Sequence, residues 1–173
     1  MLFKFLKHRK YKKLVRKSAE FILGEFAEIT NSVIEDFERK DKLQSPLQKE
    51  VLKFETTAYV FWLFQKTDVF SEVWHKLLLD EIHNQYYNRL KKHGYNFELR
   101  QLVANDFNLR YQTYNDVFNQ DKDIVRIGAS FVHFLNERSK SNYVLEQMNI
   151  PLYLTDKVTA KFIEWRKEMN TEV

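Results

Sequence analysis

The sequence predicts an all-α protein: a single compact bundle of five or six helices, with a long first helix and an apolar second helix at its centre. Apolar residues recur every three or four positions along most of the chain, which is the spacing of one helix face. The 3 Gly and 2 Pro are too few for the many turns of a β-sandwich or β-barrel. A length of 173 residues fits one domain, and 44% hydrophobic residues are enough to build a core.

The first helix is predicted from about residue 8 to residue 40. One stripe of this segment alternates spacings of three and four residues, and seven of its eight members are apolar. We therefore expect one face of this helix to lie on the core. The stripe comprises Tyr11, Val15, Ser18, Ile22, Phe26, Ile29, Val33 and Phe37.

The second helix is predicted over residues 46–66. Ser45 is a good N-cap, Pro46 suits the first helical position, and Gln48 can complete a capping box. The following run Ala58–Phe64 holds seven consecutive apolar or aromatic residues, so this helix needs cover on all sides. A β-strand can also hold such a run, but the helical start signal and the lack of a partner strand argue against one.

The third helix is predicted over about residues 69–92. The cations of Lys91-Lys-His-Gly94 suit the negative end of a helix, and Gly94 suits the left-handed position that follows it. The apolar positions of this helix are Phe70, Val73, Trp74, Leu77, Leu78, Ile82, Tyr86 and Leu90.

The fourth helix is predicted to follow Asn96, a good N-cap. Its inward positions are Leu99, Val103, Phe107, Tyr111, Tyr114 and Phe118. Its outer face is expected to be polar with little charge, which is compatible with a contact surface. That face comprises Asn105, Asn108, Arg110, Gln112, Asn115, Asn119 and Gln120.

A fifth helix is predicted after Asp121 or Asp123, and a last one after Thr155 or Asp156. Asn149-Ile-Pro151 is expected to break the chain between them. The inward positions are Ile124, Ile127, Phe131 and Leu135 in the fifth helix and Val158, Phe162, Trp165 and Met169 in the last. The most buried side chains of the domain are expected to include Trp62, Leu63, Trp74, Leu77, Phe107, Phe131 and Phe162.

The charge is uneven along the chain. The formal net charge is +4, but 8 of the 28 Lys and Arg precede the first acid, Glu20, so the rest of the chain carries a net −4. We therefore divide the sequence into a basic N-terminal arm over residues 1–17, leading into the first helix, and one helical domain over residues 8–173. Residues 1–8 are expected to be poorly ordered. The cations of the arm are Lys4, Lys7, Arg9, Lys10, Lys12, Lys13, Arg16 and Lys17.

Three interpretations of the arm stay open. Leu2, Phe3, Phe5 and Leu6 among the lysines can insert at an anionic membrane surface. The same cations can bind nucleic-acid phosphates, an option that we rank below the membrane. The arm can also be a solubilising start to the first helix. The opening segment lacks the order of a secretory signal, so we expect a cytoplasmic protein, with peripheral membrane contact as an added option.

The residue types exclude several chemistries. Zero Cys excludes disulfides, thiolate metal sites and a cysteine nucleophile, and no Gly lies in a phosphate-binding motif. Carboxylate and histidine side chains on helices remain as an alternative metal set, comprising Glu55, Glu72, His75 and His133. Glu72-Val-Trp-His75 and Asp80-Glu-Ile-His83 have the spacing of helical metal ligands, but they lie about 12 Å apart along one helix, too far for a dinuclear centre.

Glu55 is the acid of most interest because Phe54 and the run Ala58–Phe64 surround it. A carboxylate in apolar surroundings has a raised pKa unless it is paired, and such groups are candidate functional sites. The competing interpretation is that Glu55 reaches solvent or pairs with a Lys, Arg or Tyr. His133 is a candidate haem ligand on the same reasoning, with a satisfied core histidine as its competitor.

The composition favours a binding domain over an enzyme. The 15 Phe, 9 Tyr and 3 Trp suit a large core or a groove for an apolar ligand or partner helix. We expect a non-catalytic interaction domain without a cofactor, whose partner is a protein, a second copy of itself, or an anionic membrane surface. The alternative is a helical-bundle enzyme or cofactor protein with the carboxylate and histidine site above or an apolar ligand pocket.

Overall fold

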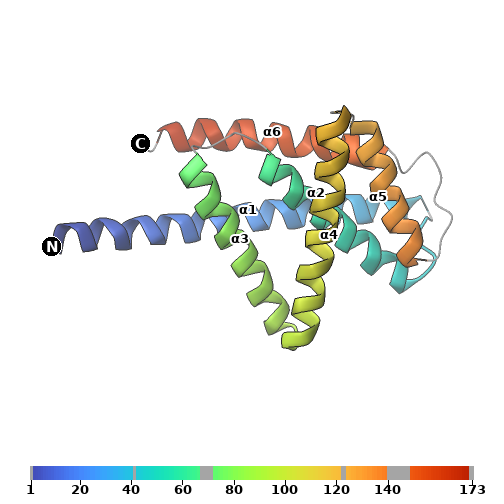
Figure 1. The fold of residues 1–173 in the computed structure, drawn as a ribbon, viewed down its shortest axis with the longest axis horizontal. Helices are drawn as coiled ribbons and strands as arrows, with labels where there is room; N and C mark the ends of the chain where they lie inside the picture. The colour runs from blue at the N-terminus through green and yellow to red at the C-terminus, as the bar shows by residue number, and fades with distance from the viewer. Residues whose placement is uncertain (1, 41, 67–71, 122–123, 140–148, 172–173) are drawn as a thin grey trace.

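The computed structural model describes residues 2–40, 42–66, 72–121, 124–139 and 149–171, and side chains within the first ten residues and beyond Trp165 are excluded from the description. The chain over these ranges forms six helices and no strand, which confirms the predicted all-α bundle (Figure 1). The helices are α1 (Leu2–Arg39), α2 (Pro46–Lys66), α3 (Glu72–Lys92), α4 (Phe97–Asp121), α5 (Ile124–Ser139) and α6 (Asn149–Thr171).

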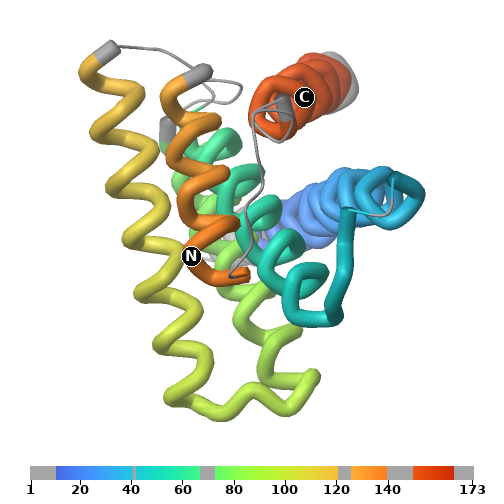
Figure 2. The backbone as a smooth tube through the Cα atoms, turned by 90° about the vertical axis from the view of Figure 1, so that its right-hand side faces the viewer, coloured from blue at the N-terminus to red at the C-terminus, as the bar shows by residue number. Residues whose placement is uncertain are grey.

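The second helix is the centre of the bundle. Each of the other five helices contacts α2, while α1 also packs on α3 and α6 (Figures 1 and 2). The helices α3 and α4 form a hairpin that hangs away from the long pair α1 and α6, and α5 lies beside α4. This arrangement leaves a corner where the hairpin, α1 and the start of α2 meet.

The apolar run of α2 is covered on every side, as predicted. All residues from Ala58 to Phe64 are buried. The two polar atoms of its large aromatic residues have partners: Trp62 Nε1 donates to Asn115 Oδ1 at 3.0 Å, and Tyr59 shares a hydrogen bond with Thr155 at 3.1 Å. A fully surrounded helix with satisfied indole and phenol groups forms a rigid centre for the fold.

Five of the seven expected core side chains are buried: Trp62, Leu63, Phe107, Phe131 and Phe162. The prediction is wrong for Leu77, which is 38% exposed, and for Trp74, which is half-buried with its ring 4.9 Å from that of Tyr11. The reason is that α3 lies at the edge of the bundle and buries only a narrow stripe through Leu78 and Ile82.

The predicted helix ends are formed largely as expected. Ser45 Oγ accepts from the Gln48 amide at 3.2 Å, and Gln48 Oε1 accepts from the Gln44 amide at 2.6 Å, one residue earlier than in a standard capping box. Asn96 Oδ1 accepts from the Leu99 amide at 2.8 Å. Gly94 has a φ of 87°, which turns the chain sharply between α3 and α4.

Two predicted boundaries are wrong. The first helix begins at Leu2 rather than near residue 8, so the arm is a continuation of α1, and in Figure 1 this end projects beyond the body. Lys, Leu and Arg favour helix, and extending an existing helix costs little. The last helix begins at Asn149, with Pro151 in its first turn. Proline is tolerated there because the first amides of a helix have no partner within it.

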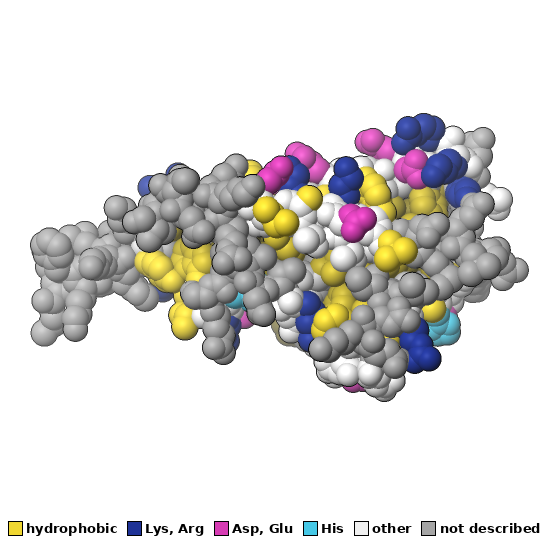
Figure 3. All heavy atoms as spheres, turned by 90° about the horizontal axis from the view of Figure 1, so that it is seen from above, with side chains coloured by type: hydrophobic (Ala, Val, Ile, Leu, Met, Phe, Trp, Pro, Cys, Tyr) yellow, Lys and Arg dark blue, Asp and Glu magenta, His cyan; other side chains and the backbone are white. Residues whose placement is uncertain are grey.

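The described part of the chain holds no helix with the length and hydropathy needed to cross a bilayer. On the side of the molecule where α6 lies, acidic and basic side chains are mixed (Figure 3). Lys161 of α6 illustrates this mixing, since its Nζ lies 3.0 Å from a Glu25 carboxylate oxygen and 3.4 Å from one of Glu164. The described surface there has no field of a single sign.

Candidate binding groove

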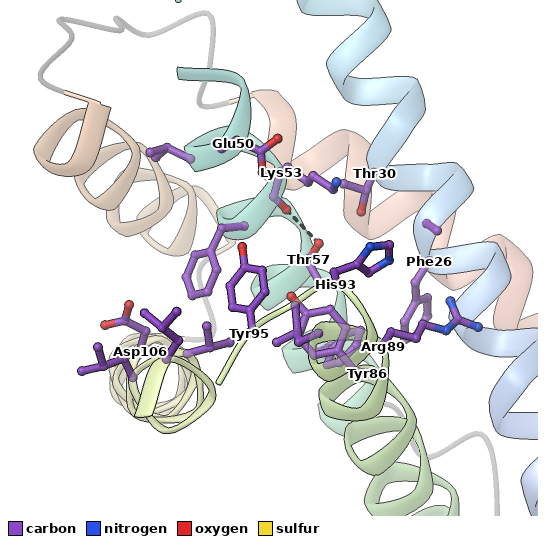
Figure 4. Close-up of a pocket in the computed structure, with 18 of the residues that line it drawn as sticks. Phe26, Thr30, Glu50, Lys53, Thr57, Tyr86, Arg89, His93, Tyr95 and Asp106 are labelled. Atoms are coloured by element: carbon purple, nitrogen blue, oxygen red, sulfur yellow. Dashed lines mark hydrogen bonds between the residues drawn. The ribbon is translucent and has the colours of Figure 1, made fainter. Parts of the chain in front are cut away.

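A groove of about 630 Å³ occupies the corner between α1, α2 and the α3–α4 hairpin (Figure 4). Its wall is formed by one face of α1 around Phe26 and Thr30, the first half of α2, the last turns of α3 and the first turns of α4. Asp106 of α4 and Arg138 at the end of α5, which form an ion pair at 3.0 Å, also line it. The volume falls in the range of roughly 300–1,000 Å³ that is typical of small-molecule sites.

The groove exists because of how the hairpin turns. Gly94 at positive φ and the Asn96 cap reverse the chain within a few residues, so that Leu90 of α3 and Leu99 of α4 both face the same space. Tyr95, in the turn itself, points into the groove in Figure 4. Residues three and four apart on each helix share one face, which brings Leu99, Leu102 and Val103 to the same wall.

The mouth of the groove is apolar and exposed. Leu47 of α2 and Leu102 of α4 are 56% and 59% exposed, although both line the groove. Leu99 and Tyr95 are also exposed, and Phe97 lies beside them. Large apolar side chains gathered at a concave site, rather than scattered singly, are typical of a binding surface.

The side of the groove nearest α1 is polar. Thr30 is only 3% exposed, and its buried hydroxyl has no hydrogen-bond partner among the residues that the structure describes. Lys53, Arg89 and His93 also line the groove, and Figure 4 shows Lys53 and His93 near Thr30 and Arg89 beside Phe26. Neither Lys53 nor Arg89 forms an ion pair within the described ranges.

Beneath the groove lies a buried charge network centred on Glu55. Arg110 donates two hydrogen bonds to this carboxylate, from Nη2 to Oε1 at 2.7 Å and from Nε to Oε2 at 3.1 Å. Glu55 is 0% exposed and Arg110 is 3% exposed. This bidentate geometry is the strong form of an Arg–carboxylate pair.

Arg138 and Asp106 connect this network to the groove. Arg138 Nη1 lies 3.8 Å from Glu55 Oε1, while its Nη2 lies 3.0 Å from Asp106 Oδ2. The two arginines and two acids balance in charge. Aromatic faces complete the site, because the Arg110 guanidinium lies 4.1 Å from the ring centre of Phe134 and that of Arg138 lies 4.7 Å from the ring centre of Phe54.

Burial raises the pKa of the Glu55 carboxyl, while the hydrogen bonds and positive charge of Arg110 act against that rise. Burial by itself would lower the pKa of Arg110, but the carboxylate reverses this effect and raises it. The bidentate geometry of the two hydrogen bonds is that of a guanidinium paired with a carboxylate. Of the two interpretations that the sequence left open for Glu55, the paired one is confirmed.

The three members of the alternative metal set whose side chains are described, Glu55, His75 and His133, lie apart. Glu55 faces Arg110, whereas His75 stacks on Phe64 with ring centres 4.9 Å apart, nine residues further along α2, which corresponds to about 13 Å of helix. His133 is exposed on α5, with Nε2 4.0 Å from a Glu137 oxygen. The side chain of Glu72 lies outside the description. The side chains that are described include no group of three or more His, Asp or Glu placed to hold a metal ion.

His83, from the second spacing on α3, is half-buried and hydrogen-bonded at both ring nitrogens. Its Nδ1 lies 2.9 Å from the Leu79 carbonyl oxygen, so Nδ1 carries a proton, and its Nε2 lies 3.0 Å from the Tyr111 hydroxyl, which donates to it. Burial lowers the pKa of His83. This residue is a neutral packing histidine in the fold.

Sequence reasoning missed Arg110, Arg138 and Asp106. It placed Arg110 on the outer polar face of the fourth helix, which is wrong, because Arg110 is buried. The signal was present in the spacing: Arg110 follows Phe107 by three residues and precedes Tyr114 by four, so it belongs to the inward stripe. Asn115, from the same supposed outer face, accepts the hydrogen bond from Trp62.

The cations of the arm divide into two groups. Lys12, Lys13, Arg16 and Lys17 are exposed on α1, next to the exposed side chains of Tyr11 and Leu14. The side chains of Lys4, Lys7, Arg9 and Lys10 lie outside the description, although their backbone belongs to α1.

Comparisons with protein-family models, with curated proteins and with solved structures gave no match for this chain. The structural features that bear on function are the groove, the charge network and the basic end of α1.

Proposed function

We propose that this protein is a non-catalytic binding module and that the groove between α1, α2 and the α3–α4 hairpin is its binding site. The observation that carries the proposal is the exposed apolar mouth around Leu47, Leu99 and Leu102 over a cavity of about 630 Å³. Burying one such leucine under a ligand is worth roughly 1.5–3 kcal/mol. Burial of these leucines therefore favours the binding of a ligand with a large apolar part.

The charge network supports binding rather than catalysis. Glu55, the acid that first suggested chemistry, is 0% exposed and has both oxygens engaged by Arg110. A general acid or base has to reach the proton that it transfers. Here the carboxylate instead positions Arg110 and Arg138 against α2 and α4, and so holds the floor of the groove in one shape.

A neutral apolar dye, Nile red, tests the site in a fluorescence titration of the full chain. Leu102→Glu should weaken dye binding about tenfold or more, since it removes one buried leucine contact and adds a charge. Leu109→Glu is the matched control, because Leu109 is an exposed leucine of the same helix outside the groove. Equal binding by both variants, each with its helical circular dichroism spectrum intact, would refute the groove as the site.

A second candidate function is attachment to an anionic membrane through α1, in a cytoplasmic protein. The specific observation is that α1 projects beyond the body (Figure 1) with Lys12, Lys13, Arg16 and Lys17 exposed beside Leu14. Each cation near an anionic bilayer contributes about 1 kcal/mol. Such a helix suits surface binding that weakens with salt.

Co-sedimentation with phosphatidylserine vesicles tests this second candidate. Changing Lys12 and Lys13 to Gln should weaken binding about thirtyfold at low salt, from about 2 kcal/mol for the two charges. Changing the adjacent exposed pair Lys91 and Lys92 to Gln at the end of α3 removes the same charge elsewhere. If both double variants bind as the unchanged protein does, α1 is not the membrane contact.

A further inference from the structure

We infer that the groove selects a singly charged anionic amphiphile, with its carboxylate or phosphodiester head beside Thr30 and Lys53 and its apolar tail along α4. This inference rests on the proposed function and adds the chemical class of the ligand. The two ends of the groove differ: Thr30 and Lys53 lie on one side and Asp106 on the other (Figure 4).

The hydroxyl of Thr30 indicates where the anionic head of the ligand binds. It is buried within the groove wall and lacks a hydrogen-bond partner in the described structure. Most buried polar groups of native proteins are paired, so an unpaired one at a cavity points to a partner supplied by a ligand. An anionic oxygen accepts from a hydroxyl in a strong, charge-assisted hydrogen bond.

The net charge of the groove lining favours an anionic ligand over a cationic one. Asp106 and Arg138 neutralise each other at 3.0 Å on the far side. The fixed charges that remain in the lining are the cations Lys53 and Arg89 and the acid Glu50, which leaves an excess of one positive charge. His93 adds a hydrogen-bonding ring near the same end. One negative charge on the ligand balances this set, whereas a cationic head would meet like charge.

The apolar part of the groove lining provides a surface for the tail of the ligand. From the polar side the lining continues into Phe54, Val103, Leu99 and Leu102, which are apolar. The mouth beside these residues is open to solvent, as the exposure of Leu102 shows. A linear chain laid along this wall covers the exposed leucines and keeps its charged head at the Thr30 side.

A small amphiphile fits these features better than a protein helix does. The polar group that needs a partner is 3% exposed, so the occupant must bring a slender charged group deep into the wall. A volume of about 630 Å³ matches a single small ligand. An acidic amphipathic helix is the competing occupant, and the experiment includes it.

The experiment is displacement of Nile red from the full chain by four probes at neutral pH and low salt. The probes are decanoate, decanol, decyltrimethylammonium and a designed acidic amphipathic helical peptide. Decanoate should bind at least about tenfold more tightly than decanol, a difference of about 1.4 kcal/mol, and the cationic probe should bind most weakly. Raising the salt concentration should reduce the advantage of decanoate over decanol.

Three variants locate the head. Lys53→Met and Thr30→Val should each weaken decanoate binding severalfold and weaken decanol binding much less, because decanol carries no charge. Lys92→Met, which removes an exposed charge of α3 outside the groove, should change neither. The decanol measurement also shows that each variant keeps a folded groove.

The outcomes separate this inference from the proposed function. Equal binding of decanoate and decanol, with no effect of Lys53→Met, would overturn the anionic head and leave the groove intact as a site. Displacement of Nile red by the acidic peptide but not by decanoate would also overturn it, in favour of a protein helix. Failure of Nile red to depend on Leu102 would remove the proposed site itself.

Discussion

Removal of the Arg110 guanidinium by Arg110→Met is the sharpest test of the buried network. The substitution keeps the apolar stem of the side chain but deletes both hydrogen bonds to Glu55, at 2.7 and 3.1 Å. Glu55 then remains 0% exposed with only Arg138, 3.8 Å away, as a cationic neighbour. Breaking one partner of a buried ion pair costs about 3–5 kcal/mol because a charge is left uncompensated.

The expected loss lies at the lower end, about 3 kcal/mol, for two reasons. Arg138 offers partial compensation. Loss of Arg110 also removes the charge that opposes the burial-driven rise in the pKa of Glu55, so that the carboxyl can take up a proton. Urea denaturation followed by circular dichroism measures the free energy of unfolding. The double variant Glu55→Met, Arg110→Met should recover most of this loss, because an apolar pair of similar volume needs no charge balance. This recovery is the mark of a coupled pair.

Arg39→Met serves as the matched control, since Arg39 pairs with Asp36 at 3.3 Å on the exposed surface. It should cause no measurable change. A loss below about 1 kcal/mol for Arg110→Met would refute the description of Glu55 and Arg110 as a buried, mutually dependent pair. Additive losses in the double variant would refute the coupling itself.

Three further predictions follow from the same structure. Trp62→Ala should cost about 3–5 kcal/mol of unfolding free energy in urea, whereas Leu77→Ala, at a 38% exposed position, should cost much less; similar losses would contradict the observed core. His83 has a folded-state pKa below its ordinary value of 6.5, so its stabilising contribution is complete above that pH and is lost as the pH falls through the folded pKa. The unfolding free energy should therefore drop below about pH 6.5 more steeply in the unchanged protein than in His83→Gln, and parallel pH profiles would contradict a neutral, buried His83. Gly94→Ala should cost about 1 kcal/mol in thermal or urea unfolding because Gly94 has a φ of 87°, and a neutral result would contradict the tight turn between α3 and α4.

Much of this protein follows from its sequence, where the signals are local. The 3.6-residue spacing from Val15 to Phe37 predicts the buried face of α1, and the Ser45 and Asn96 caps predict the starts of α2 and α4. The central place of α2 follows from seven adjacent apolar residues, since no single face of a helix can bury them all. Helix periodicity, capping residues and the length of an apolar run each depend on residues a few positions apart. These signals can therefore be recognised from the sequence alone.

The candidate binding groove depends on the tertiary structure and could not be predicted from local sequence signals. The partners Glu55 and Arg110 are 55 residues apart, and neither the bidentate pair nor its link through Arg138 to Asp106 leaves a local signal. The groove needs the hairpin at Gly94 to bring Leu90 and Leu99 opposite Thr30 and Lys53. Helix periodicity predicts which face of each helix is apolar, but it does not predict the distance between two helices. That separation depends on crossing angles and side-chain packing between remote segments, and it is what makes an apolar face of α4 a groove wall rather than part of the core.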